Sequence, residues 1–204
     1  MNTFTDIYKK NQWGGRESRS GRGSDSDYTV LVKEGVKDIV RNYGIKSIYD
    51  AGCGDFNWMK DIMGGLPGVG YLGVDVVEEA VRHNQKKYKL HNCAFRVGSI
   101  LEKVIKVDLV ICRDVLVHLM FKDVSKFLEM FRKSKAKYLL MTSFTGNRIN
   151  KERFDGICEW CPINFQKEPF NLPEPLVIIR EKFQWDEGNP YKDKSLLLWR
   201  RKDI

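Results

Sequence analysis

Hydrophobic positions along the chain follow two spacings, one typical of buried strands and one typical of helices. Short, mostly apolar runs predict strands ending near residue 49 and covering 71–75, 95–97, 107–112 and 138–142. Between them, apolar residues recur every three or four positions, which predicts helices over about 27–43, 56–63, 77–88 and 122–132. Asp27 is the expected N-cap of the first of these helices, and Gly44 follows its last residue. Strands that alternate with helices predict an α/β fold with a doubly wound parallel sheet.

The last part of the chain has a different pattern. Segments 176–183 and 196–200 both alternate like strands, with no helical pattern between them. They predict a terminal antiparallel pair added to the parallel sheet.

The turn after the first strand is a candidate nucleotide-binding site. Residues 47–58 read Ser-Ile-Tyr-Asp-Ala-Gly-Cys-Gly-Asp-Phe-Asn-Trp, and Gly52 and Gly54 would let a ligand approach bare backbone amides. The dinucleotide fingerprint has a third glycine where this chain has Asn57. About 20 residues further on, Asp75 ends the next strand, placed to accept hydrogen bonds from a ribose. The turn and the acid together predict a nucleoside ligand.

A polar, glycine-rich segment, residues 1–27, precedes the first long helix and is called the leader below. A disordered arm is one interpretation. Trp13 and the closely spaced glycines favour another, a shaped loop that acts as a lid over the ligand. In that interpretation Arg16 or Arg19 pairs with a carboxylate of the ligand, and Ser18 and Ser20 donate hydrogen bonds to it.

The end of the fourth strand carries the candidate chemistry. Ligands of open α/β sheets bind beyond the carboxyl ends of the strands, where Arg113 and Asp114 are expected. Asp114 and His118 are four residues apart, so one helical turn would place them on the same face. A histidine suits removal of a proton from an alcohol at neutral pH. We hypothesise that His118 is a general base and that Asp114 orients it or binds the alcohol hydroxyl from which His118 takes the proton. A structural role for His118 stays open.

A long connection, residues 144–175, follows the fifth strand and is rich in Asn, Pro and aromatic residues. Its length predicts a functional loop or lid on the acceptor side. Trp160, Phe165 and Phe170 either stack on a sugar or another flat acceptor, or cover the edge of the sheet. Cys158 and Cys161 form a CxxC without a second pair, which does not predict a zinc site.

The glycine turn and the acid-tipped second strand resemble motifs I and II of the class I S-adenosylmethionine-dependent methyltransferases. Longer stretches resemble the small glycan-associated O-methyltransferases of bacteria and large DNA viruses, some of which lie beside or are fused to glycosyltransferases. These stretches are Trp13-Gly14-Gly15, Glu17 to Gly21, Asp55 to Met59, Cys112-Arg113-Asp114 with Val117-His118-Leu119, Pro169 to Pro173, and Asp193 to Leu196 with Leu198-Trp199.

The resemblance implies a Rossmann-like, seven-stranded, mostly parallel sheet. It also implies S-adenosyl-L-methionine as cofactor, S-adenosyl-L-homocysteine as product, and O-methylation of a sugar hydroxyl, such as that of a terminal deoxyhexose (rhamnose) on a glycan. The third strand leads to Ser99-Ile100 where many class I enzymes have an acid, so adenine is expected to contact Ser99, Ile100 and backbone. The expected cofactor residues are Trp13, Arg16, Ser18, Arg19, Asp50, Gly52, Gly54, Phe56, Trp58, Asp75, Val76, Ser99, Ile100 and Arg113. The expected acceptor residues are Asp114, Trp160, Phe165, Phe170 and Lys194.

Composition fits one domain over residues 28–204 behind the leader, because 204 residues with 42% hydrophobic content suffice for one core. The net charge of +8 raises an anionic partner and, with it, the alternative of a nucleic-acid methyltransferase. Against that alternative, the fourth strand ends in Cys-Arg-Asp-Val and lacks the Asn/Asp-Pro-Pro-aromatic run of exocyclic amino methylation. A third alternative is a non-catalytic, cofactor-binding module.

Three further features of the sequence concern membrane insertion, cellular location and metal binding. No run of about 18 apolar residues occurs, so no membrane span is expected. Cys53, Cys93 and Cys112 fall in or beside strands as free thiols, which indicates a reducing, cytoplasmic location, the host cytoplasm if the protein is viral. Asp114 and His118 alone are too few ligands for a cation, so no metal ligand is assigned and metal dependence stays open.

Overall fold

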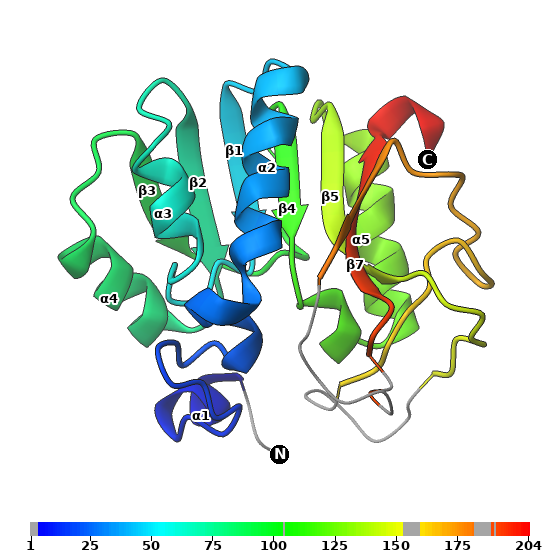
Figure 1. The fold of residues 1–204 in the computed structure, drawn as a ribbon, viewed down its shortest axis with the longest axis horizontal. Helices are drawn as coiled ribbons and strands as arrows, with labels where there is room; N and C mark the ends of the chain where they lie inside the picture. Colours follow the sequence, from blue (N-terminus) through cyan, green and yellow to red (C-terminus); the bar gives the residue numbers. More distant parts are fainter. Residues whose placement is uncertain (1–3, 104, 153–159, 182–188, 190) are drawn as a thin grey trace.

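The computed structural model describes residues 4–103, 105–152, 160–181, 189 and 191–204. Its centre is a seven-stranded sheet in the order β3-β2-β1-β4-β5-β7-β6 (Figure 1). The first five strands in this order are parallel, and β7 pairs antiparallel with both β5 and β6. This confirms the predicted sheet. The strands are β1 (Ser47–Ala51), β2 (Gly70–Asp75), β3 (Cys93–Val97), β4 (Leu109–Cys112), β5 (Tyr138–Phe144), β6 (Val177–Arg180) and β7 (Lys194–Arg200).

Helices lie on both faces of the sheet. α2 (Val30–Asn42) and α3 (Met59–Met63) cover one face, and α5 (Phe121–Lys133) covers the other (Figure 1). α4 (Glu78–Lys87) follows β2, and α1 (Phe4–Lys9) lies below the carboxyl ends of the parallel strands. Short 3₁₀ turns occur at Arg22–Ser24, Ser26–Tyr28, Leu116–His118 and Arg201–Asp203.

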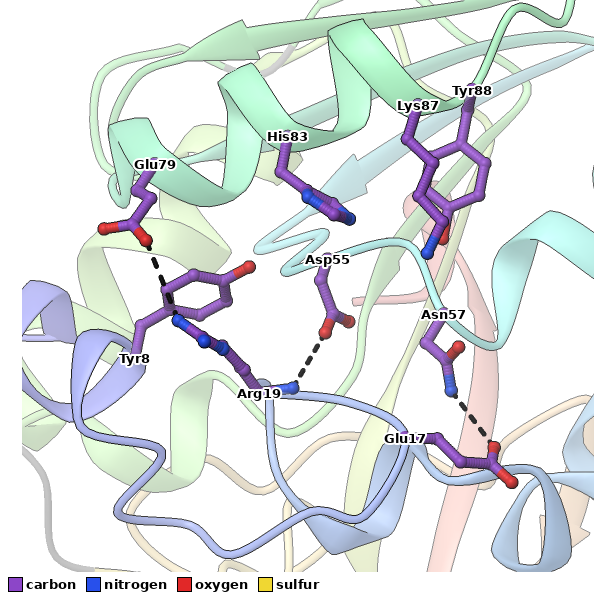
Figure 2. A pocket seen from close by; sticks show the side chains of 9 residues that line it. All are labelled: Tyr8, Glu17, Arg19, Asp55, Asn57, Glu79, His83, Lys87 and Tyr88. Carbon is purple, nitrogen blue, oxygen red and sulfur yellow. Dashed lines mark hydrogen bonds and ion pairs between the residues drawn. The ribbon is translucent and has the colours of Figure 1, made fainter.

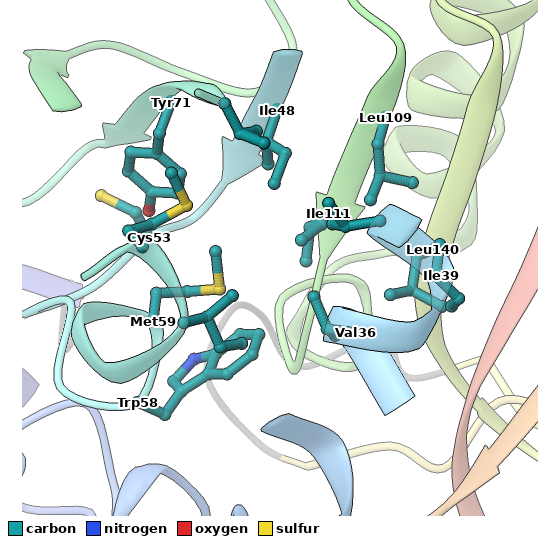
Figure 3. Packing of buried hydrophobic residues seen from close by; sticks show 14 of the residues in the cluster. Val36, Ile39, Ile48, Cys53, Trp58, Met59, Tyr71, Leu109, Ile111 and Leu140 are labelled. Carbon is teal, nitrogen blue, oxygen red and sulfur yellow. The ribbon is translucent and has the colours of Figure 1, made fainter. Parts of the chain in front are cut away.

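The core has one layer on each side of the sheet. On the first side, Val36 and Ile39 of α2 and Met59 of α3 pack with Ile48 and Ile111 of the central strands (Figure 3). On the second side, the aromatic residues of α5 pack against β1, β4 and β5. All four residues of β4 are buried, as expected for a strand covered on both faces. Burial of each large apolar side chain contributes about 1.5–3 kcal/mol, so these layers dominate the stability of the fold.

Two helices begin later than the sequence predicts. Asp27 does not cap α2: it lies in the turn Ser26–Tyr28, and Thr29 occupies the N-cap position. Phe56 does not start α3, because its backbone adopts a left-handed conformation with φ of 62°. The ring of Phe56 is buried among Tyr71, Tyr88 and Phe95, which holds the residue in the turn. The strand predicted over 176–183 is β6, and Phe183 lies outside the described residues.

The described part of the leader is folded onto the turn that follows β1, as a shaped loop and not a disordered arm. Buried Asp25 accepts backbone N–H groups from Arg16, Glu17 and Ser18 at 3.0, 3.0 and 3.2 Å. Buried Asp55 accepts the Ser18 hydroxyl at 2.8 Å and the Arg19 N–H at 2.8 Å. Two carboxylates therefore satisfy backbone donors that a loop would otherwise leave to water.

Within the described residues, no helix combines the length and the apolar character needed to cross a membrane.

Candidate functional site

The turn after β1 requires glycine at two positions. Gly52 and Gly54 have φ of 86° and 52°, a backbone region that other L-residues rarely adopt. A Cβ on Gly52 would lie 2.3 Å from Cγ2 of Val115, and one on Gly54 would lie 2.2 Å from Oγ of Ser20. Ser20 Oγ also accepts the backbone N–H of Asp55 at 3.0 Å, so the leader packs directly on the turn.

Asp75, the last residue of β2, is oriented by the same turn. Its two carboxylate oxygens accept the backbone N–H groups of Val77 and Gly54, both at 2.9 Å. A carboxylate oxygen has more than one lone-pair site, so each oxygen can accept a further hydrogen bond from a ribose hydroxyl. Burial raises the pKa of Asp75, an effect that the N–H groups of Val77 and Gly54 oppose.

A cavity of about 320 Å³, called the cofactor cavity, lies against this turn at the carboxyl ends of β1, β2 and β4. Its size suits a nucleoside ligand. The glycine backbone, the oriented carboxylate of Asp75 and the small Ser99 with Ile100 supply what an adenosyl group needs, so the residues fit the expected cofactor. The predicted cofactor residues that line the cavity are Trp13, Gly52, Gly54, Trp58, Asp75, Val76, Ser99, Ile100 and Arg113.

Three predicted leader residues do not line the cofactor cavity. Arg16 is exposed and pairs with Asp27 at 2.9 Å. Ser18 is buried and donates to Asp55. Arg19 pairs with Glu79 at 3.8 Å and lines a separate polar cavity of about 350 Å³ between the leader and α4 (Figure 2).

Asp50 and Phe56 also lie away from the cofactor cavity. Asp50 is buried in β1, where its carboxylate accepts the Tyr71 hydroxyl at 2.7 Å. Burial raises the pKa of Asp50 to about 7, although the hydrogen bond from Tyr71 lowers it. Neither residue is therefore placed to contact a ligand in that cavity.

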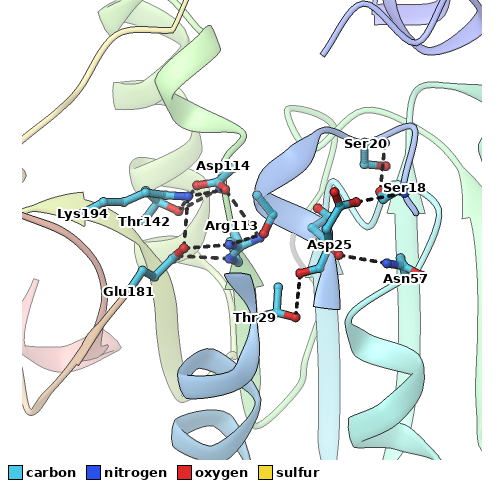
Figure 4. Close-up of polar contacts among 12 residues, drawn as sticks. Ser18, Ser20, Asp25, Thr29, Asn57, Arg113, Asp114, Thr142, Glu181 and Lys194 are labelled. Carbon is cyan, nitrogen blue, oxygen red and sulfur yellow. Dashed lines mark hydrogen bonds and ion pairs between the residues drawn. The ribbon is translucent and has the colours of Figure 1, made fainter. Parts of the chain in front are cut away.

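Four ionised side chains meet just after the ends of β4 and β6 and at the first residue of β7, and form what we call the charge cluster (Figure 4). Arg113 binds Glu181 through Nε at 3.2 Å and Nη2 at 2.7 Å, and Nη2 also donates to the carbonyl oxygen of Gly23 in the leader at 2.8 Å. Lys194 Nζ lies 2.6 Å from Asp114 and 3.2 Å from Glu181. Two cations and two anions balance one another.

Asp114 is held firmly within this cluster. Its φ is 58°, its backbone N–H donates to Oγ1 of Thr142 at 2.8 Å, and its carboxylate accepts that hydroxyl at 2.8 Å. Burial raises the pKa of Asp114, but the charges of Lys194 and Arg113 lower it further, to about 2. The carboxylate is therefore ionised at neutral pH.

His118 lies in the 3₁₀ turn Leu116–His118, against aromatic rings. Its ring stacks on Trp13 with a centroid distance of 5.2 Å and an interplanar angle of 27°. The expectation that one helical turn sets Asp114 and His118 on the same face is wrong, because Asp114 precedes the turn in a left-handed conformation. Both residues nevertheless line the cofactor cavity.

A second cavity of about 360 Å³, called the acceptor cavity, adjoins the first, and both include Trp13, Ser20, Asp114 and His118 in their walls. Of the predicted acceptor residues, Asp114, Trp160 and Lys194 line it. Phe165 and Phe170 do not: their rings pack on each other at 5.0 Å, and Phe170 packs on Phe121 at 5.1 Å. The remaining wall comes from Gly21, Arg22, Gly23 and Tyr191.

Sequence reasoning missed several of these residues. Thr142 follows from the rule that the carboxyl ends of parallel strands face the site, a rule applied to β4 but not to β5. Tyr8 and Ser24 of the leader line the cofactor cavity, and no local pattern points to them. Cys158 of the CxxC lies outside the described residues. Across the described residues, no group of three or more His, Cys, Asp or Glu that would hold a metal ion is found.

Comparisons with known proteins agree with this geometry. Residues 49–136, which span β1 to β4 and α5, match the family model of a methyltransferase domain. No curated protein sequence matches the chain. The matched segment carries the glycine turn and most of the residues that line the cofactor cavity, and the order of the sheet agrees with the Rossmann-like fold expected of class I methyltransferases.

Solved structures share the fold at low sequence identity. Human N-acetylserotonin methyltransferase in complex with S-adenosylmethionine has a TM-score of 0.64 at 15% identity, over 97% of this chain and 58% of that one. Magnesium protoporphyrin IX methyltransferase from Synechocystis PCC 6803, with bound S-adenosylhomocysteine, has a TM-score of 0.58 at 14% identity, over 98% and 89%. Mitomycin 7-O-methyltransferase has a TM-score of 0.60 at 15% identity, over 83% and 53%. This chain therefore spans less than two thirds of the first and third of these proteins.

Proposed function

We propose that the protein transfers a methyl group from S-adenosylmethionine to a sugar hydroxyl, such as that of a terminal deoxyhexose (rhamnose) on a glycan. The observation that carries the proposal is that Asp114 and His118 stand in the walls of both the cofactor cavity and the acceptor cavity. A methyl group that passes from one cavity to the other would pass beside these two side chains.

The acceptor cavity has the character of a sugar site. Trp13, Trp160 and Tyr191 supply aromatic faces, which pack well against the C–H face of a sugar ring. The carboxylate of Asp114 can accept hydrogen bonds from the hydroxyl groups of the ring, and the ammonium group of Lys194 can donate hydrogen bonds to them. This combination suits a small polar molecule with one apolar face.

The ionisation of Asp114 separates the roles of the two candidate catalytic residues. A carboxylate with a pKa lowered to about 2 is a poor proton acceptor at neutral pH, although it accepts a hydrogen bond well. In this proposal Asp114 accepts the hydrogen bond of the acceptor hydroxyl and aligns its oxygen. His118 takes the proton as the oxygen attacks.

The cofactor, when bound, supplies an electrophilic methyl group on a positively charged sulfur, which is a good leaving group. The protein therefore mainly has to align the acceptor and exclude water. The glycine turn and Asp75 would hold the cofactor, Asp114 would align the acceptor oxygen toward the methyl group that the cofactor supplies, and His118 would take the hydroxyl proton.

The test is an assay of methyl transfer to rhamnosyl oligosaccharides, with mass spectrometry to detect an added methyl group and quantification of S-adenosylhomocysteine. The His118→Ala variant should keep its affinity for the cofactor and lose turnover by roughly a hundredfold or more. Full turnover in this variant would remove His118 as the base. If none of the sugars tested gains a methyl group, the sugar proposal is refuted.

The net charge of +8 favours a second candidate, a nucleic-acid methyltransferase. An RNA or DNA oligonucleotide included as acceptor distinguishes the two. If nucleic acid is the acceptor, affinity should fall steeply between about 50 and 200 mM salt, whereas recognition of a neutral glycan should change little. A protein that binds the cofactor but releases no S-adenosylhomocysteine with any acceptor would indicate the third alternative, a non-catalytic module.

A further inference from the structure

His118 is enclosed by aromatic rings that come from distant parts of the chain. Trp13 stacks on its imidazole at 5.2 Å, while Trp160 and Phe4 contact it in edge-on arrangements at 5.5 and 6.1 Å. Phe4 and Trp13 belong to the leader, and Trp160 to the connection between β5 and β6. The imidazole is buried, with 8% of the residue exposed.

His118 is the last residue of a short turn. The 3₁₀ turn that carries it has only three residues, Leu116–His118, and the next residue, Leu119, is extended. The rings packed against the imidazole restrain its plane. Among these rings, Trp13 lies closest to parallel, at 27°, whereas Trp160 and Phe4 meet the imidazole at 72° and 81°, so the face of the imidazole rests on Trp13.

We infer that Trp13 is a positioning residue that acts through His118, and that the leader thereby completes the catalytic site. The inference rests on the proposed role of His118 as the base. Because Trp13 and His118 both line the two cavities, a change in the tilt of the imidazole would move its nitrogen relative to an acceptor hydroxyl.

The position of Trp13 is itself well determined. Its Cβ lies so close to Gly21 that a Cβ added there would be 3.2 Å away, and Phe4 packs on its ring at 6.1 Å. The leader beyond it is tied to the glycine turn through Asp55 and to β4 through the hydrogen bond from Arg113 to Gly23. The stack on His118 therefore belongs to a structure anchored at several points.

Steady-state kinetics of four variants test the inference: Trp13→Ala, Trp13→Phe, His118→Ala and the double variant Trp13→Ala/His118→Ala. At saturating cofactor and acceptor, Trp13→Ala should lower kcat by roughly tenfold or more, because misplaced catalytic groups cost rates of this order. Trp13→Phe keeps a flat ring and should restore kcat to within about threefold. Gln12→Ala, an exposed neighbour in the leader, is the matched control and should leave kcat unchanged.

The double variant separates positioning from substrate binding. If Trp13 acts through His118, the double variant should turn over no more slowly than His118→Ala, because the group to be positioned is gone. Effects that multiply would show that Trp13 acts independently, and would overturn the inference, as would an unchanged kcat in Trp13→Ala.

Cofactor affinity, measured by calorimetry, and the melting temperature show whether Trp13→Ala is still folded. If it is not, Trp13→Leu, which fills more of the space but has no flat ring, replaces it together with the double variant Trp13→Leu/His118→Ala, and the same rule decides. Full turnover in His118→Ala would instead reject the proposed base, so the two failures are distinguishable.

Discussion

Replacement of Lys194 by methionine should destabilise the protein far more than removal of an ordinary surface lysine. Lys194 is 2% exposed, and its Nζ lies 2.6 Å from Asp114 and 3.2 Å from Glu181. The Lys194→Met variant keeps the length and apolar stem of the side chain but removes its charge. The charge cluster then holds two carboxylates against Arg113 alone, which is a net negative charge in a buried site.

The magnitude follows from burial. An exposed ion pair contributes about 0–1 kcal/mol, but removal of one partner of a buried pair costs about 3–5 kcal/mol, because the other charge is left uncompensated. For a domain of this size each kcal/mol lowers the melting temperature by roughly 2–4 °C, so a loss of roughly 6–20 °C is expected. Lys192→Met, which changes an exposed lysine two residues away, is the control and should stay within about 0.5 kcal/mol.

Urea denaturation followed by circular dichroism measures the difference. The slope with denaturant should stay unchanged while the midpoint falls. The double variant Glu181→Gln/Lys194→Met restores neutrality and should be less destabilised than the sum of the two single variants, by about 0.5–3 kcal/mol. A loss below about 1 kcal/mol in Lys194→Met would refute the reasoning, since the charges would then be effectively solvated.

Three further outcomes are expected. Asp75→Ala should weaken cofactor binding by roughly 10- to 150-fold in calorimetry, because hydrogen bonds to a charged group contribute about 1.5–3 kcal/mol; unchanged affinity would exclude the ribose role. Gly52→Ala should lower the free energy of unfolding by more than about 1–2 kcal/mol, because φ is 86° and the new Cβ would meet Val115; the additional change Val115→Ala should recover part of this loss in the same denaturation assay. Asp50→Asn should remove a pH dependence of stability: burial raises the pKa of Asp50 to about 7 in the folded state, so the wild-type protein should lose stability as pH rises from about 4 through 7, and the variant should not. Parallel curves for the two proteins across this window would contradict the assignment.

Local patterns were sufficient for much of the fold. The all-apolar β4 and the alternation of strands and helices predict the parallel sheet because burial on both faces leaves a direct mark on the sequence. The glycines at 52 and 54 and the acid at 75 are equally local, since a left-handed turn and a strand end each require particular residues at fixed spacing. Helix starts were less predictable, because the buried ring of Phe56 holds its backbone in a turn that the helical spacing does not reveal.

The contacts that shape the candidate site are mostly long-range. Trp13 and His118 are 105 positions apart in the sequence, and Arg113 and Glu181 are 68 apart. The local sequence around these residues therefore does not predict the contacts. Phe165 and Phe170 show the converse: aromatic residues in a long connection look like acceptor contacts, yet they pack on one another and on Phe121. Whether an aromatic ring faces a cavity or the core depends on packing, which only the fold defines.

The charge cluster changes how the antiparallel end of the sheet should be regarded. Thr142 comes from β5, Lys194 from β7, and Glu181 from the residue directly after β6, while Arg113 and Asp114 follow β4. The hairpin formed by β6 and β7 therefore contributes charged residues to the candidate site, and it is not interchangeable with a hairpin of unrelated sequence. A chimaera that takes this hairpin from a structurally similar protein would need a lysine and a glutamate at the matching positions. Without them, Arg113 and Asp114 would lose their buried partners.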